Sequence, residues 1–202
     1  KSGTSNTVKA KVPKSINLSK NWEVTFPLQN ETSKKRRYKT LTSWSDSSEE
    51  DIQHFSGTAI YEKKFNLSKE YLSKENALEL DLGSVGVIAE VIVNDQKVAK
   101  LWKTPFRIAI DDYVKAGQNT LKIEITNMWV NRLIGDEKLP LDYKRRGDKI
   151  KTLPNWLDNP EMRSSKRQTF ASWKHWNKED TLLPSGLLGP VKINIFKIIK
   201  ID

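Results

Sequence analysis

Apolar and polar residues alternate along most of the chain, with the period of two that a β-strand with one buried face produces. The alternation becomes persistent from Gly57 onward, and it uses β-branched residues such as Val91 and Val93, which favour strands over helices. Alternating stretches lie at residues 22–26, 59–67, 78–82, 85–93, 98–102, 106–110, 121–125 and 191–195. About eight short strands at close spacing predict an all-β fold, an antiparallel β-sandwich or jelly roll.

Local breaks in this pattern predict how the strands are connected. Asn94–Lys97 has the composition of a tight turn, so we expect a hairpin there. Gly117–Asn119 is expected to form another turn. The apolar parity changes between Ile195 and Phe196, which a β-bulge would explain. The polar and basic segment Gln29–Lys39 is predicted to be a loop.

The organisation predicted from these signals is a lead-in, one domain and one long insertion. Residues 1–16 are polar and are interpreted as a linker or loosely attached lead-in, and residues 17–202 as a single β-sandwich domain. Residues 127–190 show no sustained period, and irregular segments of that length are usually functional or disordered. Tryptophans argue against disorder, so we expect function in this insertion. It contains Trp129, Trp156, Trp173 and Trp176.

The composition is that of an ordinary globular protein, with 37% hydrophobic and 30% charged residues. There is no cysteine, which excludes disulfides, thiol catalysis and cysteine-ligated zinc. The chain has only two histidines, His54 and His175, which makes a Ser-His triad or a histidine-rich metal site improbable. No apolar stretch approaches the roughly 18 residues that span a bilayer, so we expect no membrane segment. Because the chain begins with Lys1, we expect a mature or excised piece whose export signal lies outside it.

The net charge of +10 raises the question of an anionic partner. Most lysines alternate with apolar residues, as the solvated face of a sheet requires. The densest basic run is Lys144–Lys151, for which a solvated loop is favoured over an anionic partner such as a nucleic acid.

Four sequence motifs occur along the chain, and their order and spacing together are more specific for a protein family than any one of them alone. They are found in Phe55–Phe65, Leu80–Asn94, Pro105–Leu121 and Ser185–Val191. In this order they resemble the sugar-binding sandwich domain of glycoside hydrolase family 2, with Asp95 in a position where glycine is usual. Asn127–Glu137 resembles the corresponding domain of large bacterial α-L-rhamnosidase-like enzymes. The resemblance covers approximately residues 20–200.

The resemblance implies a galactose-binding-like fold in a non-catalytic module of a larger glycoside hydrolase. The partners it implies are a glycan or the catalytic domain of the parent chain, with no cofactor, in an extracytoplasmic bacterial location. We also expect a monomer. Glycoside hydrolysis needs two carboxyl groups that face each other across a sugar-sized gap. Asp136 and Glu137 are adjacent and should diverge, so we expect no catalysis by the chain itself. A purely structural interdomain sandwich and an anion-binding module remain the alternatives.

The first candidate carbohydrate-binding site contains Asn131, Arg132, Asp136 and Glu137, in a turn that follows a predicted strand, with Trp129 beside it. Arginine offers a planar fork of donors and aspartate offers acceptors, which suit sugar hydroxyls. By analogy with family 2, in which a loop of this region can reach the active site, Asn131, Arg132 and Asp136 would contact the substrate. The alternative is an internal ion pair between Arg132 and Asp136 that orders the loop.

The second candidate site contains Trp156, Trp173, His175 and Trp176. Aromatic faces stack on the C–H faces of sugars, and tryptophan is a preferred anchor at binding surfaces. Packing is favoured over sugar binding for this cluster, because Trp173 and Trp176 would point to opposite faces of a strand, with one of them in the core. Three other tryptophans lie near strand signals and are predicted core residues: Trp22, Trp44 and Trp102.

A structural calcium ion is a further hypothesis, because related sandwiches often hold one through oxygen ligands in a loop. The acidic residues available for it are Asp46, Glu49, Glu50 and Asp51, and the pair Asp111 and Asp112. Neither spacing is diagnostic, and a solvated loop is favoured for both.

Overall fold

The computed structural model describes residues 6–28, 32–163 and 165–201, with side chains from Lys14 to Ile199 within these ranges. The chain divides into two compact units. Unit 1 comprises Lys1–Ser43, Thr58–Asn127 and Ser185–Asp202, and unit 2 comprises Trp44–Gly57 and Met128–Pro184.

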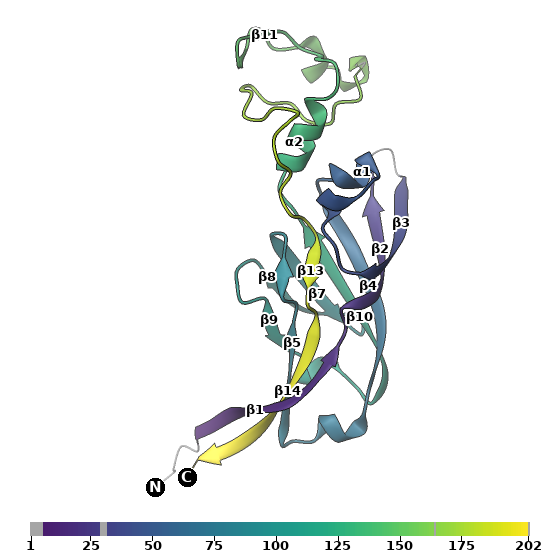
Figure 1. Ribbon diagram of the computed structural model, residues 1–202, viewed down its shortest axis with the longest axis vertical. Helices are drawn as coiled ribbons and strands as arrows, with labels where there is room; N and C mark the ends of the chain where they lie inside the picture. Colours follow the sequence, from purple (N-terminus) through teal and green to yellow (C-terminus); the bar gives the residue numbers. More distant parts are fainter. Residues whose placement is uncertain (1–5, 29–31, 164, 202) are drawn as a thin grey trace. The chain divides into compact units, whose positions relative to one another are not determined.

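Unit 1 contains a six-stranded and a four-stranded sheet, the two layers of a β-sandwich (Figure 1). The larger sheet has the order β3 (Ser33–Thr40), β2 (Lys20–Pro27), β4 (Thr58–Leu67), β10 (Gly117–Thr126), β7 (Ile88–Val93) and β8 (Gln96–Leu101). The smaller sheet has the order β1 (Asn6–Asn17), β14 (Lys192–Ile201), β5 (Asn76–Asp81) and β9 (Arg107–Ala109). Shorter elements are the paired strands β6 (Ser84–Val85) and β13 (Leu187–Gly189) and the 3-10 helices η2 (Lys69–Leu72) and η3 (Asp111–Tyr113). Neighbouring strands run antiparallel, which confirms the predicted antiparallel β-sandwich.

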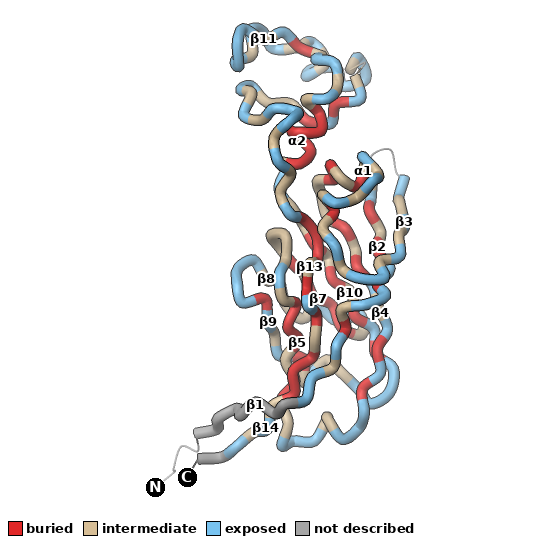
Figure 2. Tube along the Cα trace, viewed as in Figure 1, coloured by how far each residue is buried: buried red, intermediate tan, exposed pale blue. Residues whose placement is uncertain are grey.

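The strand register aligns a row of buried side chains across the six-stranded sheet. Val24 pairs with Tyr61, Tyr61 pairs with Ile123, and Ile123 pairs with Val91. Each of these four side chains is 0% exposed. Successive side chains of a strand point to opposite faces of the sheet. The sequence neighbours of these four residues therefore lie on the solvent side of this sheet. Figure 2 shows the resulting alternation of buried and less buried positions along the strands.

The hairpin predicted at Asn94–Lys97 is confirmed. Asn94 and Asp95 connect β7 to β8 with φ angles of 49° and 64°. A type I′ turn requires positive φ at both central residues, and Asn and Asp tolerate this conformation better than other non-glycine residues. Asn94 Nδ2 also donates to the Tyr113 carbonyl oxygen at 2.8 Å, which connects the turn to the end of η3.

Two expectations about the first forty residues change. Residues 1–5 of the predicted lead-in lie outside the described residues, but from Asn6 the backbone forms β1, which pairs with β14. Most of Gln29–Lys39, predicted to be a loop, is strand β3 from Ser33 onward; its residues 29–31 lie outside the described ones. The loop prediction was wrong because β3 is an edge strand whose positions are charged on both faces. The assignment of residues 17–202 to one domain stays a prediction.

The irregularity expected near Ile195 lies on the neighbouring strand. The register between β1 and β14 shifts between Lys11 and Ser15, which pair with Phe196 and Asn194. The extra residues lie on β1, opposite Ile195, whereas β14 itself pairs with β5 without a shift from Lys192 to Lys197, so no bulge within β14 accounts for the change of apolar parity.

Unit 2 contains little regular structure. Its elements are the 3-10 helices η1 (Trp44–Asp46), η4 (Asn155–Leu157) and η5 (Pro160–Met162), the helices α1 (Glu50–Gln53) and α2 (Val130–Asp136), and the hairpin of β11 (Arg145–Arg146) and β12 (Lys149–Ile150). Helix α2 is largely buried (Figure 2). None of the helices that the structure describes has the length and apolar character needed to cross a bilayer.

Of the three tryptophans predicted to be core residues, two are buried and one is exposed. Trp22 is 0% exposed in unit 1, and Trp44 is 0% exposed in unit 2, where its ring contacts Phe55 edge-on. Trp102 is 68% exposed. Ala99 and Leu101 of β8 lie opposite the buried Val91 and Ala89, so Trp102 shares its parity with the exposed Lys100 and belongs to the outer face of the sheet.

Candidate functional site

Helix α2 brings Arg132 and Asp136 together inside unit 2. Residues four positions apart lie on the same face of a helix, and Arg132 Nε is 3.0 Å from Asp136 Oδ1. The Arg132 residue is 9% exposed and Asp136 is 0% exposed. The sequence suggested a turn here; the backbone instead forms about two helical turns, with five buried residues of seven.

The second oxygen of Asp136 organises a distant loop. Asp136 Oδ2 accepts hydrogen bonds from the backbone amides of Gln168 and Thr169, at 2.8 and 2.7 Å, and from Thr169 Oγ1 at 2.7 Å. The ion pair given above as the alternative to sugar contact is therefore present, and it is combined with a buried hydrogen-bond network. All three side chains, Asn131, Arg132 and Asp136, have partners within unit 2. Contact between a sugar and these residues stays a prediction.

Glu137, the residue after α2, lies at the centre of a cationic cluster. Arg145 donates to both of its carboxylate oxygens, at 2.9 and 3.0 Å, and Arg167 Nη2 donates to Oε1 at 2.5 Å. Lys174 Nζ lies 3.8 Å from Oε2. Burial of Glu137 disfavours its charged form, but the hydrogen bonds from Arg145 and Arg167 outweigh that effect and lower the pKa of the carboxyl to about 2. Glu137 is consequently a fixed anion at any physiological pH.

A shallow depression lies directly over this cluster. Its lining includes Glu137, Arg145, Arg167, Trp173, His175 and Trp176. The enclosed volume is about 20 Å³, which is room for one water molecule. A sugar ring could therefore cover the mouth of the depression but could not enter it. The structure thus brings together four of the predicted site residues, Glu137, Trp173, His175 and Trp176.

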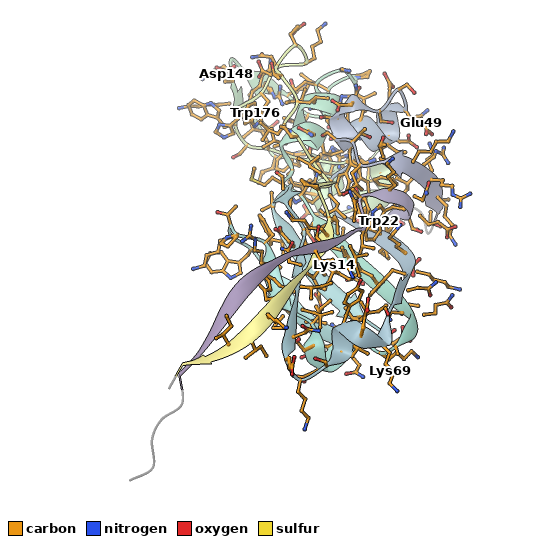
Figure 3. The ribbon with its side chains drawn as sticks, turned by 60° about the horizontal axis from the view of Figure 1, so that its bottom comes forward. Lys14, Trp22, Glu49, Lys69, Asp148 and Trp176 are labelled. Atoms are coloured by element: carbon orange, nitrogen blue, oxygen red, sulfur yellow. The ribbon has the colours of Figure 1, made fainter. Side chains whose placement is uncertain are left out.

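The β11–β12 hairpin positions Trp173. The segment before His175 runs beside β12, with Ile150 N donating to the Ser172 carbonyl at 2.9 Å and Lys174 N donating to the Asp148 carbonyl at 2.8 Å. Lys149 Nζ lies 4.7 Å from the centre of the Trp173 ring, within cation–π range. Figure 3 labels Asp148 and Trp176 in this part of unit 2.

The expectation that one tryptophan of the Trp173–Trp176 segment would be a core residue was wrong. Trp173 is 44% exposed, and Trp176 is half-buried. Extended pairing of this segment with β12 is confined to the residues around Trp173, so the alternation of a regular strand does not continue to Trp176.

Two other predicted site residues lie away from this depression. Trp156 is half-buried; its Nε1 donates to the Asp142 carbonyl at 2.8 Å, and the Arg163 guanidinium lies 4.2 Å from its ring centre. Trp129, which precedes α2, is 59% exposed. Trp156 therefore has a packing role within unit 2, while Trp129 offers an open aromatic face.

Two arginines of the cluster were not identified from the sequence. Arg145 belongs to the basic run interpreted as a solvated loop, yet its side chain is only 10% exposed and is paired with Glu137. Arg167 has a 3% exposed side chain and lies thirty residues from Glu137 along the chain. Its sequence neighbours show no periodic pattern, so no local signal marked it as a buried ion.

No cluster of three metal-ligating side chains occurs within the ranges that the structure describes. Of the acidic residues considered for calcium, Asp111 accepts a hydrogen bond from the backbone amide of Leu78 at 2.7 Å. A structural calcium ion stays a prediction.

The sequence matches known proteins along most of its length. Residues 9–189 match the family described as "Glycosyl hydrolase 2 galactose-binding domain-like". A proposed beta-glucuronidase of Formosa agariphila is 57% identical over 189 residues, which cover 94% of this chain and 16% of that protein. The chain therefore spans less than one fifth of the length of this relative.

Two solved structures superpose on most of the chain. A rhamnosidase from Novosphingobium sp. PP1Y superposes with a TM-score of 0.72 and 29% identity, covering 93% of this chain and 15% of that protein. The beta-D-glucuronidase of Dictyoglomus thermophilum has the same fold, with a TM-score of 0.58, 20% identity, and coverage of 91% of this chain and 28% of that one.

Proposed function

The chain belongs to the galactose-binding-like domains of glycosyl hydrolase family 2, and we propose that it acts as a non-catalytic accessory domain of a larger glycoside hydrolase. In this proposal, unit 2 contacts the glycan that the catalytic domain of the parent chain binds. Uronic-acid-containing glycans are the substrate class that we propose for the parent, after the named activity of its relative in Formosa agariphila.

The observation that carries this proposal is the meeting of Trp173, His175 and Trp176 over the Glu137 cluster. Aromatic side chains supply faces for the C–H surfaces of a sugar, and the partly exposed ammonium group of Lys174 supplies a donor for its hydroxyl and carboxylate oxygens. The small enclosed volume suits contact with the side of a glycan that another domain holds.

The same geometry argues against catalysis by this chain. A glycosidase needs a carboxylic acid that is protonated at working pH, which requires a raised pKa. The pKa of Glu137 is lowered to about 2, so this group cannot donate a proton at neutral pH. Asp136 is fully buried and bound by Arg132 and Thr169, so its carboxylate has no access to a substrate.

The experiment is kinetic and uses the parent enzyme. Trp173→Ala combined with Trp176→Ala should lower kcat/KM for an oligosaccharide about thirtyfold, because two stacking contacts of about 1 kcal/mol each are lost. Hydrolysis of a small aryl glycoside should change little. Trp102→Ala is the control, since it removes a tryptophan from unit 1 that is even more exposed than Trp173. An unchanged kcat/KM for the oligosaccharide in a folded double variant would contradict glycan contact.

A purely structural role is the second candidate, favoured by the exposed apolar side chains of unit 2. Four of these are Leu141, Leu153, Leu157 and Met162, which are 40–71% exposed. Exposed apolar groups of this kind are typical of surfaces that another domain covers. Under this alternative, Leu153→Ser with Met162→Ser should lower the thermal stability of the parent enzyme, while the tryptophan variants leave its kinetics unchanged.

A further inference from the structure

A basic depression on unit 1 plays no part in the function proposed above. It lies at the β2–β3 edge of the six-stranded sheet and is lined by Lys20, Asn21, Arg37, Lys39 and Thr40. It is a shallow, open hollow with a volume of about 470 Å³. All five lining residues are exposed.

Strand register explains why these cations gather. Arg37 pairs with Glu23 on the face opposite the buried Trp22, and Lys39 lies two positions further along β3 on that same face. Lys20, at the start of β2, lines the same depression. Within the described parts of the chain, the side chains of Lys20, Arg37 and Lys39 form no ion pair. Among the described residues, no carboxylate lines this depression, so its three cations form a basic patch, an arrangement that attracts an anion.

A second depression continues from the first and shares Asn21 and Arg37 with it. Its volume is about 590 Å³, and its lining adds Lys64 and Lys122 together with the carboxylates of Glu23 and Glu62. The floor is therefore mixed in charge, whereas the β3 end is purely basic. The two depressions together form a continuous polar surface across β3, β2, β4 and β10, which we call the outer-face groove.

We propose that the outer-face groove binds a segment of a carboxylate-bearing polysaccharide, a polyuronate. Lys20, Arg37 and Lys39 would bind its carboxylates, while Glu23 and Glu62 would accept hydrogen bonds from its hydroxyl groups. This inference rests on the uronic-acid-containing substrate class proposed above, and it adds a second glycan contact that does not use unit 2.

The composition of the groove selects a polysaccharide over a nucleic acid. Non-specific binding of single strands relies on aromatic side chains that stack on bases. The groove lining includes no aromatic side chain, since Trp22 and Tyr61 of the same strands are buried on the opposite face. Carboxylates in the floor would also repel a continuous row of phosphates, but they suit a ligand that alternates charge with hydroxyl groups.

The test measures binding of polygalacturonate by the chain at low and at physiological ionic strength. The variant Lys20→Gln, Arg37→Gln, Lys39→Gln should raise Kd about tenfold or more, because three ionic contacts are lost. The matched control is Lys69→Gln, Lys74→Gln, Lys115→Gln, which removes the same charge from exposed positions outside the groove, one of them Lys69 on η2 (Figure 3). The control should change Kd by less than about twofold.

Several outcomes would overturn the inference. Absence of binding by the unaltered chain would do so, as would equal losses in the two triple variants, which would indicate net charge alone. Equal or tighter binding of dextran sulfate or of an oligothymidylate would point to a different anion. Neutral dextran should not bind. Because the oligosaccharide kinetics of the Trp173 and Trp176 variants do not involve the groove, failure here is distinguishable from failure of the proposed function.

Discussion

Asp136 on helix α2 accepts two hydrogen bonds from Thr169, one from its backbone amide and one from its hydroxyl, both at 2.7 Å. The two residues are thirty-three positions apart along the chain. One carboxylate thus fixes the end of a short helix and the path of a loop that has no regular structure of its own. The Arg132 guanidinium compensates its charge on the other side.

Asp136→Asn should lower the free energy of unfolding by about 3–5 kcal/mol, because it leaves Arg132 buried without a counter-charge. The amide nitrogen would also face donors at Gln168 and Thr169. Urea unfolding gives the magnitude, and limited proteolysis should show faster cleavage within residues 137–184. The exposed Asp148→Asn is the control and should stay within about 0.5 kcal/mol of the unaltered chain. A similarly small effect for Asp136→Asn would show that the network contributes little to stability.

Glu137 should make stability depend on pH in the acidic range. Its carboxyl has a pKa of about 2 in the folded chain against an ordinary value of 4.5. The unfolded chain binds the proton first as pH falls, so this stabilisation is complete above pH 4.5 and is lost between 4.5 and about 2. At about 1.4 kcal/mol per pKa unit, the stabilisation reaches about 3 kcal/mol.

The comparison that isolates Glu137 is with Glu137→Gln, whose amide resembles the protonated acid. The difference in unfolding free energy between the two chains should be greatest near neutral pH and should shrink as pH falls towards 2. Urea titrations at a series of pH values measure it. A difference that stays constant with pH would mean that Glu137 is not held as an anion by Arg145 and Arg167.

Gly135 is required because its neighbours leave no room for a side chain. A Cβ atom there would lie 2.6 Å from His54 Cγ and 2.6 Å from Arg132 Nη2. Gly135→Ala should therefore destabilise the chain by about 1–3 kcal/mol through overpacking. The added substitution His54→Ala should recover part of this loss, which a double-mutant cycle of unfolding free energies would detect.

Gly147→Ala is the informative comparison for this prediction. Gly147 has a φ of 61° and nothing within 4 Å of an added Cβ, so its substitution tests backbone strain without a clash. It should destabilise the chain by about 1 kcal/mol, and His54→Ala should not alter that effect. Equal rescue at both glycines would rule out the contact with His54 as the cause.

Ile123 lies in the row of buried side chains that crosses the six-stranded sheet. Ile123→Ala should lower the unfolding free energy by about 2–5 kcal/mol, because it removes buried methyl groups and leaves a cavity beside Tyr61 and Val91. Ile199→Ala, at a position 50% exposed, should have a much smaller effect. Thermal unfolding measures both, and similar shifts would contradict the assignment of Ile123 to the core.

The sandwich was predictable from the sequence because its inner faces repeat with a period of two. Trp22, Tyr61 and Ile123 each belong to an alternating stretch, and each is fully buried. The turn at Asn94 was predictable for a different reason, since its backbone conformation selects particular residue types. Both signals are local, so a single sequence contains them.

The cluster around Glu137 depends on contacts that are distant in sequence. Arg167 reaches Glu137 only after the chain has passed through a hairpin and two 3-10 helices, and nothing near Arg167 encodes that path. Strand β3 was missed for a related reason. Its positions are occupied by lysine and arginine on both faces, so pairing with β2, and not its own pattern, makes it a strand.

The side chain of Asn131 closes the base of the long irregular segment by pairing with the backbone of Leu183. Its Nδ2 donates to the Leu183 carbonyl and its Oδ1 accepts from the Leu183 amide, both at 2.8 Å, across fifty-two positions. Doubling the length of a flexible loop raises its closure free energy by only about 0.6 kcal/mol. Exposed positions between Asn131 and Leu183 that lie outside the contacts of Asp136 and Glu137 can therefore accept inserted residues at little thermodynamic penalty, provided that the closing pair is kept. This makes the segment a natural point at which related chains diversify their surfaces, and a site at which a new loop could be grafted.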